Sequence, residues 1–241
     1  MNTSGGVSVR NGRVVEIGSG RSAVSESEWA QIVCGDDLPE IPVQLGTRLL
    51  MELKVQERTV DLREVSELIL GDLGAALQIF RRAALECSSA EERPARIEDC
   101  ISNLGLQSCL DALSSERSAS DACSSEVIEA WQHAKEVAEC CKQIASEPDD
   151  AFNPDEAYLV GLFHNLYSLP VILGWGVLDS SSKATALHGL RLAEDWSLPY
   201  CVEDYFSELQ DPAHEQRWSG IVQRAHKIVN GSFLKNSLVE I

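Results

Sequence analysis

Helix-start signals recur along this chain, and they limit it to a largely helical fold. Asp61 precedes an apolar stripe and has Glu64 three residues later, which is the spacing of a capping box. Asp72 can cap a further helix. Asn153 is followed by Pro154, a residue that suits the first position of a helix. Signals of this kind predict helices that begin at defined residues.

Apolar residues then recur at helical spacing through most of the chain. The longest such segment, Glu126 to Ala145, predicts a helix with a buried face. That face consists of Val127, Trp131, Ala134, Ala138, Cys141 and Ala145. No alternating strand pattern follows residue 38, so the predicted fold class is all-α. Further helices are expected over residues 61–70, from 72 onward, and over 153–164, 184–196, 199–209 and 217–230.

Polar segments divide this helical region. Ser114 to Ser125 is rich in Ser, Asp and Glu, which is typical of a connector. We therefore expect a bundle of two lobes, about 38–113 and 126–230, followed by a C-terminal tail at 231–241. Residues 1–37 form an N-terminal extension. Within it, two short β-branched segments flank Asn11-Gly12, which predicts a short β-hairpin.

Charge and hydropathy limit the class of partner. The chain has 20 basic and 38 acidic residues, which gives a net charge of −18. Solubility is a sufficient explanation for this charge, and the charge disfavours a nucleic-acid partner because it repels phosphate groups. No apolar segment approaches the ~18 residues of a membrane helix. The first ten residues contain no apolar core typical of a secretory signal. We expect a cytoplasmic protein that binds neither nucleic acid nor membrane.

The eight cysteines include no CxxC pair, which disfavours a cysteine-ligated zinc site. In a reducing compartment they are expected to be small core residues.

Five histidines remain as candidate ligands, and His133, His164 and His226 fall on predicted helices near apolar stripes. Imidazoles on neighbouring helices can converge on one metal ion. Spacing alone favours the alternative, in which each is an ordinary hydrogen-bonded histidine.

Five segments resemble the HDOD domain family, in the order and at the separations that the family shows. They correspond to an "LPxLP" opening, a helix start, an "AIsrLGl" segment, a "GLLHDIG" segment and a segment that ends in "WgLP". In this chain they are Leu38–Pro42, Gly71–Leu77, Ile97–Leu106, Gly161–Pro170 and His188–Pro199. The resemblance covers about residues 38 to 230 and implies a helical bundle whose C-terminal half is HD-like.

The resemblance also implies where a site would lie. Active HD enzymes hold metal with a histidine, a His-Asp doublet and a later aspartate. In this chain those positions fall on His133, on His164-Asn165 and on His226, so no aligned ligand is a carboxylate. Carboxylates bind hard divalent ions and help to generate hydroxide, and Asn165 is a much weaker ligand. With His188, these residues form a candidate vestigial pocket.

We therefore expect a bacterial HDOD-type regulatory module that binds a protein partner in a signalling pathway, without catalysis and without a required cofactor. Binding of a single divalent ion by His133, His164 and His226 is an alternative that the sequence leaves open. The alternative is a divergent metal-dependent phosphohydrolase of the HD superfamily, which stoichiometric metal in the purified protein would favour.

Overall fold

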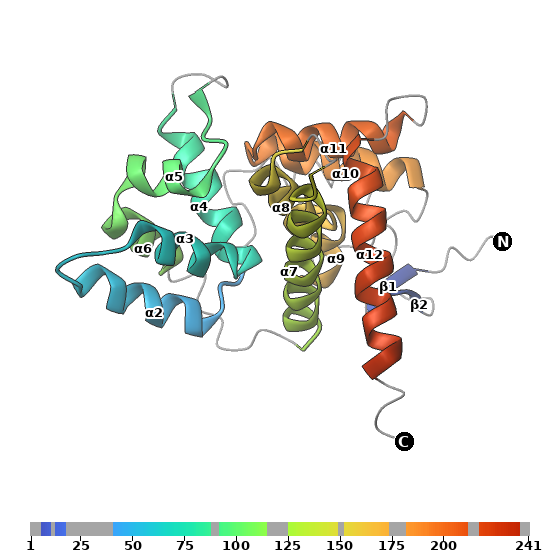
Figure 1. Cartoon of the computed structure of the whole chain (residues 1–241), viewed down its shortest axis with the longest axis horizontal. Helices are drawn as coiled ribbons and strands as arrows, with labels where there is room; N and C mark the ends of the chain where they lie inside the picture. Colours follow the sequence, from blue (N-terminus) through green and yellow to red (C-terminus); the bar gives the residue numbers. More distant parts are fainter. Residues whose placement is uncertain are drawn as a thin grey trace.

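A bundle of α-helices makes up most of the structure (Figure 1). The computed structural model describes residues 6–10, 13–17, 41–87, 92–114, 125–148, 152–173, 182–211 and 217–236. From residue 41 onward every regular element in this part of the chain is helical, which confirms the all-α class. No described helix combines the length and the apolar character needed to span a membrane.

The N-terminal half of the bundle contains α2 (Leu45–Gln56), α3 (Leu62–Leu70), α4 (Leu73–Leu85), α5 (Ile97–Leu104) and α6 (Leu106–Leu113). The C-terminal half contains α7 (Ser125–Ala145), α8 (Pro154–Phe163), the 3₁₀ helix η3 (Leu166–Ser168), α9 (Leu169–Ile172), α10 (Ser182–Asp195), α11 (Tyr200–Gln210) and α12 (Arg217–Asn236). The last helix runs on past Asn230, where the sequence predicted its end.

Two of the predicted caps show what local sequence determines and what it does not. Asp61 accepts a hydrogen bond from the Arg63 backbone N–H at 2.9 Å, as a helix cap should. Glu64 was expected to complete the capping box, but its carboxylate instead pairs with Lys54 of α2. Asn153 caps α8 by accepting from the Asp155 backbone N–H at 2.9 Å. The predicted caps are confirmed, and a tertiary ion pair replaces the predicted local contact of Glu64.

Asp72 has a wider role than the cap that the sequence predicted. Its Oδ1 accepts from the backbone N–H groups of Gly74 and Ala75, at 3.0 and 3.3 Å, and so caps α4. The same oxygen accepts from the indole N–H of Trp131 on α7 at 3.1 Å, and Oδ2 accepts from the Gln44 N–H before α2 at 2.8 Å. This fully buried carboxylate therefore joins three helices.

In Figure 1, α2–α6 gather on the left of the view and α7–α12 on the right. The buried apolar residues of both groups belong to one hydrophobic cluster, to which the α4 residue Phe80 and the α8 residue Phe163 contribute an edge-to-face ring pair. The division into two lobes thus stays a prediction. The predicted buried face of α7 is confirmed, since all six of its residues are buried.

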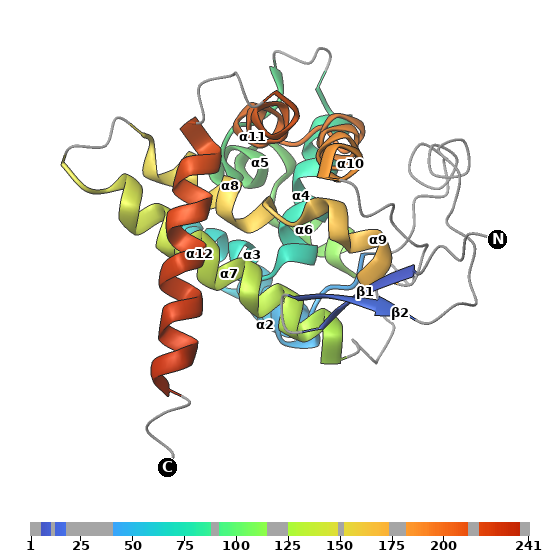
Figure 2. The ribbon, with the colours of Figure 1, turned by 90° about the vertical axis from the view of Figure 1, so that its right-hand side faces the viewer.

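Two short strands precede the bundle. β1 (Gly6–Arg10) and β2 (Arg13–Ile17) pair antiparallel, with Gly6 opposite Ile17, and β1 lies beside α9 (Figure 2). The predicted turn residues Asn11 and Gly12 lie outside the described residues, as does most of the extension, so the hairpin turn stays a prediction.

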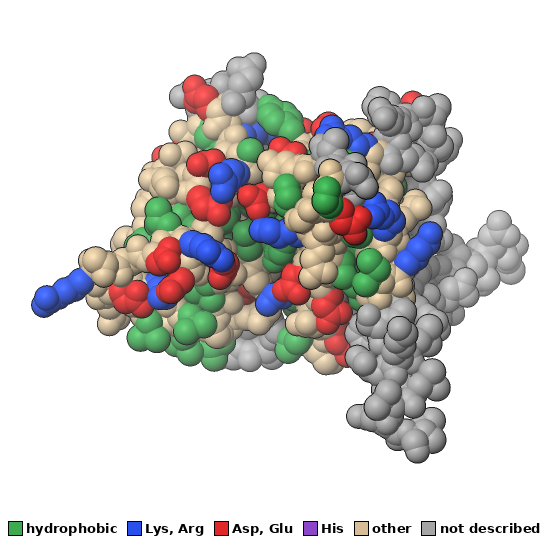
Figure 3. All heavy atoms as spheres, viewed as in Figure 1, with side chains coloured by type: hydrophobic (Ala, Val, Ile, Leu, Met, Phe, Trp, Pro, Cys, Tyr) green, Lys and Arg blue, Asp and Glu red, His purple; other side chains and the backbone are tan. Residues whose placement is uncertain are grey.

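The outer face of α2 is unusually apolar. Leu45, Leu49, Leu50 and Leu53 are each about half exposed, whereas Thr47 and Met51 are buried. In the space-filling view, hydrophobic side chains gather where α2 lies, at the lower left (Figure 3).

Candidate functional site

Helix α7 brings His133 to the centre of the C-terminal half. Trp131 and Ala134, its near neighbours in sequence, are buried in the core and fix the rotation of the helix. His133 lies at the edge of this buried face and is half-buried.

Helix α8 brings in His164, which follows its last residue. Gly161 makes the close approach to α7 possible, because a Cβ at that position would lie 2.6 Å from the Ala138 Cα. His164 is 1% exposed. Its Nδ1 lies 2.6 Å from the Gly161 carbonyl oxygen, an acceptor, so Nδ1 carries the proton and Nε2 is left with a lone pair.

Helix α12 supplies His226. The start of this helix is held by Glu208 of α11, a buried carboxylate that accepts from the backbone N–H groups of Trp218 and Ser219 at 3.0 and 2.9 Å. From there α12 packs against both α7 and α8 (Figure 2). Contacts between these helices therefore fix where His226 lies.

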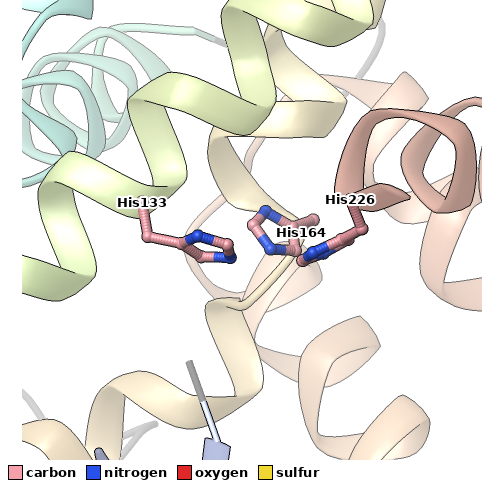
Figure 4. A group of neighbouring side chains, drawn as sticks. All are labelled: His133, His164 and His226. Carbon is pink, nitrogen blue, oxygen red and sulfur yellow. The ribbon is translucent and has the colours of Figure 1, made fainter. Parts of the chain in front are cut away.

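The three histidines meet at one point (Figure 4). Their ring centroids are 5.5 Å apart for His133 and His164, 5.2 Å for His133 and His226, and 4.7 Å for His164 and His226. One ring nitrogen from each lies within 4.8 Å of the other two. The structure thus brings together three of the residues that the sequence named.

Electrostatics keep this group uncharged. Burial, with His226 and His133 nearby, holds the pKa of His164 well below its ordinary value. Burial and the adjacent His133 lower the pKa of His226 to about 4. Burial also lowers the pKa of His133, although Glu136 opposes this effect. Near neutral pH the site therefore holds three neutral imidazoles.

A cavity of about 420 Å³ opens beside His164 and His226, between η3, α10, α11 and α12. None of the described residues that line it is Asp, Glu, Lys or Arg. Besides the two histidines, the polar lining consists of Asn165, Tyr167, Thr185, Tyr205, Ser219 and Gln223. These described residues can offer hydrogen bonds to a small ligand, and none of them carries a full charge.

The other two predicted site residues lie differently. Asn165 lies next to His164 and lines the cavity, and its backbone carbonyl accepts from the Ser168 hydroxyl at 2.7 Å. His188 is buried on α10, but it is neither one of the three grouped histidines nor a lining residue of the cavity. Sequence reasoning missed Tyr205 and Ser219, which belong to no motif.

Comparisons with known proteins agree with this architecture. The HDOD domain profile matches residues 38–173. Two crystal structures of the MmoQ response regulator from Methylococcus capsulatus (strain Bath) are similar in fold, each at 18% sequence identity. One has a TM-score of 0.60 and covers 82% of this chain and 89% of MmoQ; the other has a TM-score of 0.57 and covers 78% and 81%. No curated protein matches the sequence.

Proposed function

This chain belongs to the HDOD domain family, and we propose that it is a regulatory module that works by binding and does no catalysis. The observation that carries the proposal is the composition of the site. Asn165 and His226 stand where a two-metal phosphohydrolase has carboxylates, the three grouped imidazoles are neutral, and none of the described residues that line the adjacent cavity is charged.

The chemistry of phosphoester hydrolysis explains why this composition matters. A hard divalent ion requires negative oxygen ligands, and it uses them to generate hydroxide from water. An amide oxygen and imidazole nitrogens supply no such charge. The site is therefore suited to holding a ligand rather than to activating water at a pair of hard metal ions.

A signalling role is supported by the fold neighbour, which is called a response regulator. In this proposal the module receives or passes on a signal through a protein partner. The exposed leucines of α2 provide apolar surface of the kind that protein contacts use.

A turnover assay tests the proposal. The purified chain, supplied with manganese and a generic phosphodiester, should release no product above a metal-only control. The variants His133→Ala and His226→Ala, both at half-buried positions, serve as matched controls. Turnover in the wild type that both substitutions abolish would refute the proposal and favour a divergent metal-dependent phosphohydrolase.

A further inference from the structure

The His164 imidazole is arranged as a metal ligand rather than as an ordinary core histidine. Its Nδ1–H is committed to the Gly161 carbonyl at 2.6 Å, which fixes the tautomer and the ring plane. Its Nε2 is buried and has no hydrogen-bond partner among the described residues. A hydrogen bond from one ring nitrogen to a backbone carbonyl, with the other nitrogen bare, is the usual arrangement of a ligating histidine.

The His164 ring lies close to two further imidazoles, which come from different helices. His133 on α7, His226 on α12 and His164 each offer a ring nitrogen, and these three nitrogens lie within 4.8 Å of one another. In a tetrahedral site with metal–nitrogen distances of about 2.0–2.1 Å, ligand nitrogens lie ~3.3 Å apart. Because His133 and His226 are only half-buried, rotation of their side chains can close this gap while the helices stay in place.

From this geometry we infer that His133, His164 and His226 bind one borderline transition-metal ion of the zinc class. The inference deepens the proposed function and rests on it, since it names what the binding site holds. Imidazole nitrogens favour Zn²⁺, Co²⁺, Ni²⁺ and Cu²⁺, whereas Mg²⁺, Ca²⁺ and Mn²⁺ favour carboxylate and water oxygens. The ligand set selects against the hard ions of a hydrolytic site.

The fourth coordination position is available to an exogenous ligand. Two of the three ligands, His164 and His226, line the cavity of about 420 Å³, so the ion would lie at its wall. Ser219 also lines the cavity, and its hydroxyl is buried without a hydrogen-bond partner among the described residues. Asn165 and Tyr205 lie on the same cavity. The site would therefore hold a small neutral or anionic ligand that binds the ion and takes hydrogen bonds from these groups.

The test uses the full chain, treated with chelator and then titrated with Zn²⁺, Co²⁺, Mg²⁺ or Mn²⁺ in a calorimeter. We expect one Zn²⁺ per chain, and affinity for Mn²⁺ and Mg²⁺ lower by more than roughly 100-fold. Co²⁺ should give the intense visible bands of a tetrahedral site without a thiolate charge-transfer band. The variants His133→Ala and His226→Ala each remove a direct ligand, so each should weaken Zn²⁺ binding by at least the roughly 10–100-fold that loss of an outer-shell partner costs. His188→Gln, which removes a histidine outside the group, should leave it unchanged.

Two results would overturn the inference. One is the absence of stoichiometric Zn²⁺ binding by the folded wild type. The other is binding that survives in both His133→Ala and His226→Ala, above all with a cobalt–thiolate band, which would place the ion on cysteines. The phosphodiester assay, repeated with Zn²⁺, separates this inference from the proposed function. Zn²⁺ binding together with phosphodiester turnover would contradict only the proposal that the chain is non-catalytic. The absence of Zn²⁺ binding would contradict only the metal inference.

Discussion

Replacing Asp72 by alanine should destabilise the chain far more than removing an ordinary helix cap. The carboxylate is fully buried. It accepts hydrogen bonds from the backbone N–H groups of Gln44, Gly74 and Ala75 and from the indole of Trp131, and the Thr47 side chain also bonds to it. Alanine leaves these donors without their acceptor. The change therefore loosens α2, α4 and α7 at one point.

The magnitude follows from these contacts. Hydrogen bonds to a charged group contribute about 1.5–3 kcal/mol each. The Ala75 bond is long, at 3.3 Å, and burial raises the pKa of the Asp72 carboxyl although its donors oppose this. These two effects favour the low end of the range, so for the loss of the four bonds from backbone and indole N–H groups we expect a cost of about 6 kcal/mol in Asp72→Ala. Stabilities of natural domains are about 5–15 kcal/mol, so this variant could fail to fold.

Asp72→Asn keeps the test measurable. The amide oxygen can replace Oδ1, but the amide nitrogen then faces the Gln44 N–H, so one bond is lost and the expected cost is about 2 kcal/mol. Urea unfolding followed by far-UV circular dichroism gives both values. Asp61→Ala is the matched control, because Asp61 caps α3 through one exposed bond and should cost about 1 kcal/mol. If Asp72→Ala costs no more than Asp61→Ala, the role assigned to Asp72 is wrong.

Three further predictions concern the site and its supporting helices. Gly161→Ala should destabilise the chain by about 2 kcal/mol in urea unfolding, because its Cβ would lie 2.6 Å from the Ala138 Cα. Gly220→Ala is the control: its Cβ meets nothing within 4 Å, so it should be neutral or stabilising by about 0.5 kcal/mol. Equal effects of the two changes would contradict the close approach of α8 to α7 at Gly161. The lowered pKa of His226, about 4, means that the folded state disfavours its protonation, so its stabilising contribution is complete above about pH 6.5 and is lost as the pH falls toward 4. The melting temperature of His226→Asn should therefore fall less over that range than that of the wild type, and parallel curves would contradict this. Finally, chelator-treated wild type should keep its helical circular dichroism and its cooperative unfolding, because three neutral imidazoles and an amide leave no unpaired charge in the empty pocket; loss of helix on metal removal would contradict it.

Local signals were sufficient to predict much of the fold. The caps at Asp61, Asp72 and Asn153 lie where the sequence placed them, because a cap depends on residues two or three positions away. Contacts between helices were beyond such reasoning. Glu64 pairs with Lys54 of α2 rather than with its own helix, and the sequence alone could not reveal that competitor.

Burial patterns set a second limit. The leucines of α2 form the more apolar face of that helix, yet the structure exposes them and buries Thr47 and Met51 instead. Periodicity identifies a helix and its apolar stripe, but it does not determine whether the fold places another element against that stripe.

The site was predictable only in part. Spacing favoured ordinary histidines, and the convergence of His133, His164 and His226 depends on three helices far apart in sequence. The family resemblance is what matched these three histidines to metal-ligand positions of HD enzymes. It also led to His188, which lies outside the three-histidine group. The cavity residues Tyr205 and Ser219 could not be found, because packing of α11 and α12 rather than any motif brings them together.

The central claim is that missing carboxylates separate this site from a hydrolytic one, and a manganese titration tests it most directly. The melting temperature of the wild type should not rise with Mn²⁺, because imidazoles and an amide bind a hard ion weakly. The double variant Asn165→Asp with His226→Asp restores two carboxylates, and Mn²⁺ should raise its melting temperature as a ligand of the folded state does. If Mn²⁺ stabilises the wild type as strongly as it stabilises the double variant, the account is contradicted.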